Sequence, residues 1–278
     1  MPATDANGIR INYEIHGNDG AWVILVMGWG YGLWGWEPVV GPLAEAFRVV
    51  VFDNRGVGGT DKPPGPYTAE MMAADATGLA DALGIERAHF VGTSGGGFYA
   101  MEAAVARPDL IDRLVIACSP LPGPAEEWFH PQSVEALARV AGLEGEERFR
   151  VLIENALSPS FVADHPEIVE RILGYRLQTD MPFEAWEAQR VANLTYQDPS
   201  RVALVAQETL VTCGTNDGVV RAESAKRLAE ALPNALFVPF EGAGHLHFWE
   251  QPERFATVLG AFLGGGLEAV GRLAEASA

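Results

Sequence analysis

The chain has 278 residues, of which 48% are hydrophobic and 20% charged, and its formal net charge is −18. This length is enough for one large α/β domain with a substantial core, and the composition is that of a globular protein. The negative charge is spread along the chain, which argues against a nucleic-acid partner because phosphate binding requires clustered basic side chains. No apolar run reaches the roughly 18 residues that span a bilayer. The N-terminus lacks the basic and apolar regions of a signal peptide, so we expect a cytoplasmic protein.

Neither the cysteines nor the histidines indicate a metal site. Cys118 and Cys213 each end an apolar run typical of a buried strand, and we interpret them as small core residues rather than as a disulfide or a metal pair. The six histidines are scattered without the spacing of zinc ligands. We therefore expect no metal and no cofactor.

The first half of the chain alternates predicted strands with predicted helices. Alternating apolar and polar residues over 8–15 are typical of a half-exposed edge strand, and two continuously apolar runs are typical of strands covered on both faces. This order predicts a parallel sheet with helices on both faces. The predicted strands are 8–15, 22–27 and 48–53, and the predicted helices are 37–47 and 68–83.

A glycine-rich stretch then lies between a strand at 89–91 and a helix at 98–106. Residues 92–96 read Gly-Thr-Ser-Gly-Gly, which in this strand-to-helix context predicts a nucleophile elbow. The elbow would leave the Ser94 hydroxyl free at a sharp turn. The amide of Gly95 and the start of the helix would face the place where an oxyanion forms.

The second half of the chain predicts an insertion into the sheet. After a strand at 114–118 the pattern becomes mainly helical and contains no convincing buried strand until 209–214. We interpret this block as a helical cap, and three glycines near the end separate the last helix from an amphipathic tail. The predicted division is a core of 1–119 and 203–264, a cap of 120–202 and a tail of 265–278.

A serine nucleophile needs a base, and the base needs an orienting acid, in the chain order Ser, Asp or Glu, His. Asp217 follows the strand at 209–214 and His245 follows the last predicted strand, at 236–239, where the carboxyl ends of parallel strands meet. The alternative for Asp217 is a plain turn residue. Asp53 precedes Ser94, which favours a structural role. His247 lies between apolar neighbours and is expected to pack.

The second oxyanion donor and the pocket are predicted by position. The loop after the strand at 22–27 would supply the amide of Trp29. Aromatic residues crowd this loop and recur in the cap, which indicates a pocket for a bulky apolar group, although packing of the cap onto the core explains the cap residues equally well. Basic residues are absent from the elbow and from 27–36, so only cap arginines could balance an anionic substrate. The predicted pocket residues are Gly28, Tyr31, Trp34, Trp128, Phe129, Phe161 and Trp186.

Together these motifs resemble the α/β-hydrolase superfamily, and within it the capped esterase, enol-lactonase and aclacinomycin-methylesterase-like group. The likeness includes the glycine-rich turn at 28–32, the Asp-Asn-Arg-Gly-Val-Gly loop at 53–58, the elbow, and the loops that hold Asp217 and His245. It implies a mostly parallel eight-stranded sheet with a helical cap inserted after the sixth strand. It also implies a serine hydrolase that cleaves carboxylic esters or lactones of a bulky apolar small molecule through an acyl-enzyme.

Three positions depart from the family pattern. Met27 stands where a histidine is usual, which bears on how the oxyanion loop is held. Gly95 replaces a larger residue after the nucleophile and is expected to leave room beside the oxyanion. Thr60 replaces the common serine.

Other activities remain open on the same three residues. Carbon–carbon bond hydrolases, cofactor-free haloperoxidases or perhydrolases and acyltransferases of this superfamily also keep Ser, Asp and His, and a slow-turnover hydrolase-like receptor is a further alternative. Ser94 argues against dehalogenases and most epoxide hydrolases, which use aspartate. We expect a small-molecule substrate and a monomer or homodimer.

Overall fold

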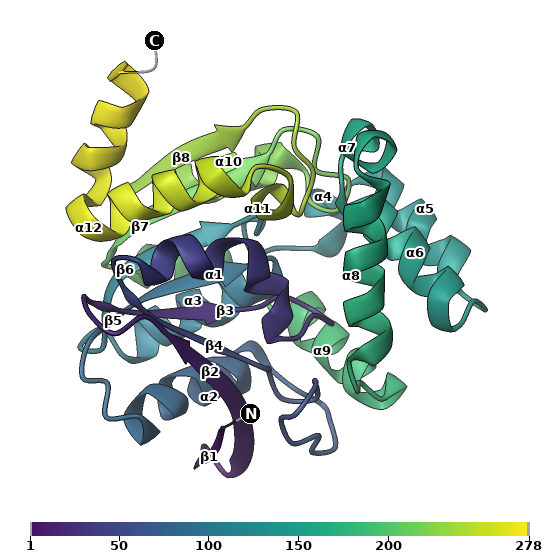
Figure 1. Ribbon diagram of the computed structural model, residues 1–278, viewed down its shortest axis with the longest axis horizontal. Helices are drawn as coiled ribbons and strands as arrows, with labels where there is room; N and C mark the ends of the chain where they lie inside the picture. The colour runs from purple at the N-terminus through teal and green to yellow at the C-terminus, as the bar shows by residue number, and fades with distance from the viewer. Residues whose placement is uncertain (1, 277–278) are drawn as a thin grey trace.

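The computed structural model describes residues 2–276 (Figure 1). Residue 1 of the predicted core and residues 277–278 of the predicted tail lie outside the described residues. One sheet has the strand order β1-β2-β4-β3-β5-β6-β7-β8. Its strands are β1 (Ala3–Ala6), β2 (Ile9–His16), β3 (Trp22–Val26), β4 (Arg48–Phe52), β5 (Ala88–Thr93), β6 (Ile111–Ala117), β7 (Glu208–Gly214) and β8 (Ala235–Phe240).

The sheet is parallel except at one edge. β1 pairs antiparallel with β2, and β2 pairs antiparallel with β4, whereas every further neighbour is parallel. The central strands are apolar throughout because helices cover both of their faces, and Val23 to Val26 are fully buried. The predicted mostly parallel eight-stranded sheet is confirmed.

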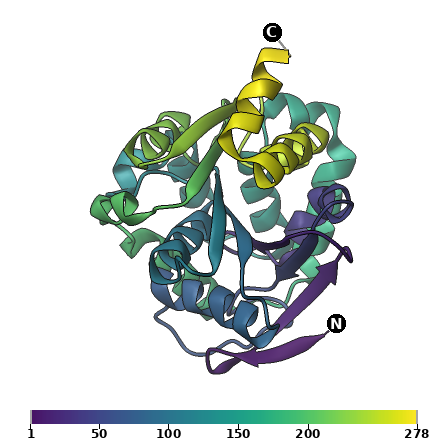
Figure 2. The same cartoon turned by 90° about the vertical axis from the view of Figure 1, so that its left-hand side faces the viewer.

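Helices cover both faces of this sheet, as Figure 2 shows. α1 and α12 lie together on one face, and α2, α3 and α10 lie on the other. The predicted cap of α2 is present, since the Thr68 hydroxyl accepts a hydrogen bond from the amide of Met71. The core helices are η1 (Leu33–Trp36), α1 (Glu37–Ala44), α2 (Ala69–Ala82), α3 (Gly95–Ala106), α10 (Ala222–Ala231), α11 (His247–Glu250) and α12 (Pro252–Ala276).

The last helix changes direction at the three glycines that the sequence predicts to precede the tail. α12 continues past the three glycines and bends at Gly266, whose φ of 69° lies in the left-handed region. Val270 beyond the bend is buried, which ties this part of the segment to the core. Within residues 2–276 no helix combines the length and apolarity needed to cross a bilayer.

The inserted helices follow the sixth strand, as predicted, and lie beyond one end of the sheet (Figure 1). They pack on one another through small and aliphatic side chains such as Ile153, Ile172 and Ala192, each fully buried. Their placement covers the edge at which the parallel strands end. They are α4 (Ala125–Trp128), α5 (Pro131–Val140), α6 (Gly145–Ala156), α7 (Pro159–Asp164), α8 (Pro166–Gln178), α9 (Phe183–Thr195) and η2 (Pro199–Leu204).

Candidate active site

Ser94 occupies the strained turn that the elbow motif predicts. Its φ and ψ are 54° and −126°, between the end of β5 and the start of α3. The turn is held on both sides, because the Ser94 amide donates to the Ala117 carbonyl at 2.8 Å and the Ser119 hydroxyl donates to the Ser94 carbonyl at 2.6 Å. Only glycine fits at position 92, where a Cβ would lie 2.2 Å from the Gly96 oxygen. This turn places Ser94 at the wall of a cavity.

Asp217 and His245 form a buried hydrogen-bonded pair. Nδ1 of His245 lies 2.8 Å from Oδ2 of Asp217, and both residues are at most 6% exposed. The other carboxylate oxygen accepts the amides of Val219 and Val220 at 2.7 and 2.9 Å. Asp217 is thus the turn residue of its loop and the partner of the histidine at once. These amides fix the carboxylate so that its second oxygen faces the imidazole.

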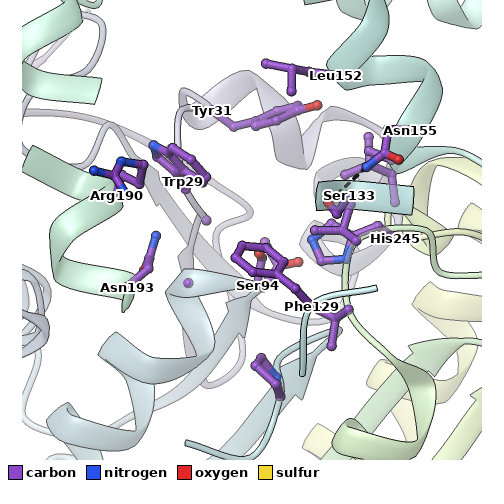
Figure 3. Close-up of a pocket in the computed structure, with 18 of the residues that line it drawn as sticks. Trp29, Tyr31, Ser94, Phe129, Ser133, Leu152, Asn155, Arg190, Asn193 and His245 are labelled. Atoms are coloured by element: carbon purple, nitrogen blue, oxygen red, sulfur yellow. Dashed lines mark hydrogen bonds between the residues drawn. The ribbon is translucent and has the colours of Figure 1, made fainter. Parts of the chain in front are cut away.

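The pKa of His245 is raised well above its ordinary value. Burial alone would lower that pKa, but the nearby Asp217 carboxylate and the Cys118 sulfur outweigh burial. The pair therefore stabilises an imidazolium, the form that a base takes after it removes a proton. Among the described residues no hydrogen bond joins the Ser94 hydroxyl to His245, although both line the same cavity (Figure 3). Such contacts often tighten only when substrate binds.

His247 and Asp53, the alternatives to His245 and Asp217 as base and acid, both have structural partners. His247 is fully buried, its Nε2 lies 2.9 Å from the Thr212 hydroxyl, and its ring packs on Phe240. Asp53 accepts hydrogen bonds from the Asn12 amide group at 2.7 Å and from the backbone of Gly59 at 2.9 Å. Both residues therefore hold the core and its loops, which is the role expected of them.

The loop after β3 lies directly against the nucleophile. A Cβ on Gly28 would lie 2.8 Å from the Ser94 Cβ, so only glycine permits this approach. The side chain of Asn54 donates to the Met27 carbonyl at 2.7 Å, which holds the loop where the family histidine is replaced. The Trp29 indole also donates to a carbonyl of α9 at 2.9 Å. The loop is thereby fixed between the sheet and the inserted helices.

Beside Ser94 and His245 lies a mainly apolar cavity of about 130 Å³. Figure 3 shows Trp29, Arg190 and Asn193 on one side of Ser94, and His245 and Asn155 on the other. Five of the predicted pocket residues line this cavity, and they come from the loop after β3, the segment around α4, and α9. They are Gly28, Tyr31, Trp128, Phe129 and Trp186.

Two predicted pocket residues point elsewhere. Trp34 stacks on Tyr175 at 5.1 Å between ring centres and donates to the Thr179 hydroxyl at 2.8 Å. Phe161 packs on His165 at 4.5 Å. Neither lines the cavity, and no other residue of η1 or α7 does, so the prediction of these two pocket residues is wrong. Both instead pack within the inserted helices or between these helices and the core.

The room expected beside Gly95 is already filled. A Cβ at this position would lie 2.3 Å from Oδ1 of Asn193, a residue of α9. The same oxygen accepts the hydroxyl of buried Tyr99 at 2.7 Å. Glycine at 95 thus permits α9 to approach the nucleophile, and Asn193 is a cavity residue that sequence reasoning missed. The only signal for it was the missing side chain at 95.

The elbow also lies close to a buried thiol. Cys118 has a φ of 46° and is fully buried, and its Sγ lies 3.1 Å from the Thr93 hydroxyl. Burial raises the pKa of this thiol, but His245 and His247 outweigh burial and bring the pKa to about 6. The cysteine is a core residue, as expected, but one that neighbours the proposed base.

The fold and the site define an α/β-hydrolase. Residues 21–252 match the family described as the alpha/beta hydrolase fold, and the chain belongs to that family. RutD of Azorhizobium caulinodans, whose name proposes a carbamate hydrolase, is 27% identical over 95% of this chain and 98% of its own. A 2-hydroxy-6-oxononadienedioate/2-hydroxy-6-oxononatrienedioate hydrolase of Paraburkholderia phymatum is 31% identical over 92% of this chain and 91% of its own.

Solved structures agree on the class. The enol-lactonase of Burkholderia xenovorans superposes with a TM-score of 0.82 at 27% identity, covering 95% of this chain and 100% of that one. The chain is therefore a hydrolase of the α/β-hydrolase family. The relatives are named for different substrates, so the family does not define the substrate of this chain.

Proposed function

We propose that this hydrolase cleaves carboxylic esters or lactones through an acyl-enzyme, with Ser94 as nucleophile, His245 as base and Asp217 as orienting acid. The observation that carries the proposal is the buried Asp217–His245 hydrogen bond, 2.8 Å long, at the wall of the same cavity that Ser94 lines. The enol-lactonase among the similar structures supports this bond class.

The proposed mechanism depends on which ring nitrogen of His245 is available to accept a proton. Asp217 occupies Nδ1 of His245, so Nε2 is the nitrogen left to remove the Ser94 proton. The Ser94 oxygen then attacks the carbonyl carbon, and the amides of Gly95 and Trp29 would bind the oxyanion. Collapse breaks the bond to the alcohol oxygen, which takes its proton from His245. Water, deprotonated by His245, attacks the acyl-enzyme and releases the acid and Ser94.

The cavity wall indicates the size of the acyl or alcohol group. Trp29 and Trp186 are in contact, with ring centres 4.3 Å apart, and Trp128 and Phe129 lie 4.2 Å apart. Rings from the loop after β3, the segment around α4, and α9 therefore form much of the wall. Such a wall favours a bulky apolar group.

The test compares wild type with Ser94→Ala on p-nitrophenyl esters from acetate to decanoate, with γ- and δ-lactones alongside. We expect a burst of p-nitrophenol followed by steady turnover in wild type, and loss of both in the variant. Turnover retained by Ser94→Ala would remove Ser94 from the mechanism. A folded wild type that consumes none of these compounds would favour carbon–carbon cleavage, acyl transfer or a receptor.

A further inference from the structure

Arg176 of α8 is a buried cation with no anionic partner. Its side chain lines the cavity and the residue is 6% exposed. The guanidinium lies over the ring of Tyr31 at 4.8 Å and over the ring of Phe149 at 4.6 Å. Within residues 2–276 it forms no ion pair and no hydrogen bond. Its five N–H donors are therefore free at the edge of the guanidinium that the two rings leave uncovered.

The second buried arginine, Arg55, does have a carboxylate partner. Arg55, the other buried arginine of the described residues, binds both oxygens of Asp75 at 2.5 and 2.6 Å. Burying a charge without such a partner is costly, and aromatic faces offset only part of that cost. Arg176 thus lacks the carboxylate that Arg55 has.

The surroundings of Arg176 are positive, although the whole chain carries a net charge of −18. Arg148 lies close enough to oppose the charge of Arg176, and no carboxylate acts on it. Arg190 also lines the cavity, but Glu187 binds its guanidinium at 2.9 Å. This part of the wall therefore holds one cation that only a ligand can neutralise.

Asn155, another cavity residue, indicates the direction in which a substrate would lie. Oδ1 of Asn155 is buried without a hydrogen-bond partner, while its amide nitrogen donates to Ser133 at 3.1 Å. Asn155 lies on the His245 side of the cavity, where the leaving group must receive its proton (Figure 3). An acceptor oxygen there disfavours a carboxylate. The anionic end of a substrate would therefore lie away from the leaving group.

Arg176 lies along the oxyanion loop. A Cβ on Gly30 would lie 3.0 Å from Nη1 of Arg176, and Gly28 on the same loop contacts Ser94. An acyl chain that extends from Ser94 along this loop would therefore run toward the guanidinium, which lines the same cavity. We propose that Arg176 binds a carboxylate on the acyl part of the substrate, so that the ester or lactone attacked by Ser94 is derived from a dicarboxylic acid. The inference rests on the proposed function for its substrate class. A carboxylate is favoured because its plane matches the guanidinium fork.

The first experiment compares mono-p-nitrophenyl esters of adipate, pimelate and suberate with the same compounds methylated at the free carboxylate. Because losing one partner of a buried charged pair is costly, we expect wild type to prefer at least one acid over its methyl ester by about 30-fold or more in kcat/KM. Arg176→Met should abolish this preference by lowering kcat/KM on the acids far more than on the methyl esters. Arg150→Gln, which removes exposed ion pairs with Glu146 of α6 and Glu170 of α8, is the matched control and should retain the preference.

The second experiment does not depend on turnover. Calorimetry with adipate as the probe should show binding to Ser94→Ala and loss of binding in Ser94→Ala with Arg176→Met. If adipate binds in a manner that depends on Arg176 but no ester is hydrolysed, the proposed function is wrong and the anion site is still supported. Hydrolysis with equal rates for acid and methyl ester would overturn the inference alone. Inorganic phosphate that competes as strongly as adipate would contradict a carboxylate site.

The melting temperature separates a ligand site from a structural role. Because the buried charge is unpaired, Arg176→Met should melt at the same temperature as wild type or higher. A clear fall in melting temperature, together with equal loss of activity on acids and methyl esters, would make Arg176 a structural residue and overturn the inference.

Discussion

Asp217 presents one carboxylate oxygen to Nδ1 of His245 at 2.8 Å and the other to two backbone amides of its own loop. The loop therefore determines the orientation of the carboxylate, and the carboxylate determines the tautomer of the imidazole. An asparagine could keep the loop contacts through its oxygen, but it would present an N–H group to Nδ1. This substitution thus separates the role of the charge from the role of the turn.

We expect Asp217→Asn to lower kcat by on the order of 10⁴-fold, as a wrong tautomer does in other triads, with little change in fold. The variant should also change the pH profile. Because the pKa of His245 is raised in the folded protein, wild-type kcat/KM should fall as the pH drops through a value above the ordinary histidine range.

Removing the Asp217 charge should lower the pKa of His245 and move this acid limb to lower pH. The measurement is kcat/KM from pH 5 to 9 for both proteins. An acid limb that stays in place would show that Asp217 does not set the charge of His245.

The two neighbouring histidines should give opposite results. His245→Ala removes the proposed base and should cost several orders of magnitude in kcat. His247→Ala leaves a hole beside Phe240 and unpairs Thr212, so it should lower the free energy of unfolding by about 2–4 kcal/mol with kcat changed much less. Urea unfolding and ester hydrolysis on both variants make the comparison. A larger loss of kcat in folded His247→Ala would reverse the assignment of the base.

The sequence predicted the sheet well where both faces are covered and poorly at the edge. Short continuous apolar runs such as 22–27 are typical of covered strands, whereas β1 has four residues of mixed polarity and pairs only with β2. The proposed triad was predictable because strand ends of a parallel sheet converge, so chain order alone brings Asp217 and His245 together.

The cavity wall could not be predicted in the same way. The direction of these side chains depends on how the inserted helices pack on the core, and this is why Trp34 of η1 turns toward α8 while Arg176 of α8 faces the cavity. Hydrophobic periodicity within one helix indicates which face is buried, but not which other element covers that face. Asn193 is the clearest case, since the evidence for it was the glycine at 95 in a distant segment.

His89 should make the fold sensitive to acid. It is 3% exposed, and burial lowers its pKa to about 4 despite the Asp112 carboxylate 3.6 Å away. Between pH 6.5 and about 4, His89 therefore binds a proton in the unfolded state but not in the folded state. The stability that neutral His89 contributes is complete above this window and is lost as the pH falls through it.

At pH 5 this proton uptake should cost roughly 2 kcal/mol relative to pH 7. His89→Phe keeps an aromatic ring against Phe47 and removes the titration. We expect the difference in unfolding free energy between pH 7 and pH 5, measured in urea, to be smaller in this variant by about that amount. An unchanged difference would assign the acid sensitivity to other groups.

The contact between Gly95 and Asn193 should couple the inserted helices to the nucleophile. Gly95→Ala places a methyl group 2.3 Å from Oδ1 of Asn193, so either the Asn193 side chain or the backbone of residue 95, with its amide, must shift. We expect a loss of about 1–3 kcal/mol in stability and a fall in kcat. Asn193→Ala alone frees the space but leaves the buried Tyr99 hydroxyl without its acceptor, which should cost about 1–3 kcal/mol.

In the double variant the alanine at 95 no longer meets the Asn193 side chain, so the two losses should not add. A double-mutant cycle on urea unfolding and on kcat should therefore give a favourable coupling of about 1 kcal/mol or more. Strict additivity in both measurements would mean that α9 does not press on the elbow in solution, and Asn193 would then be only a partner of Tyr99. Coupling in kcat without coupling in stability would instead indicate that the contact sets the position of the oxyanion donor at 95, because only the reacting geometry would register the clash.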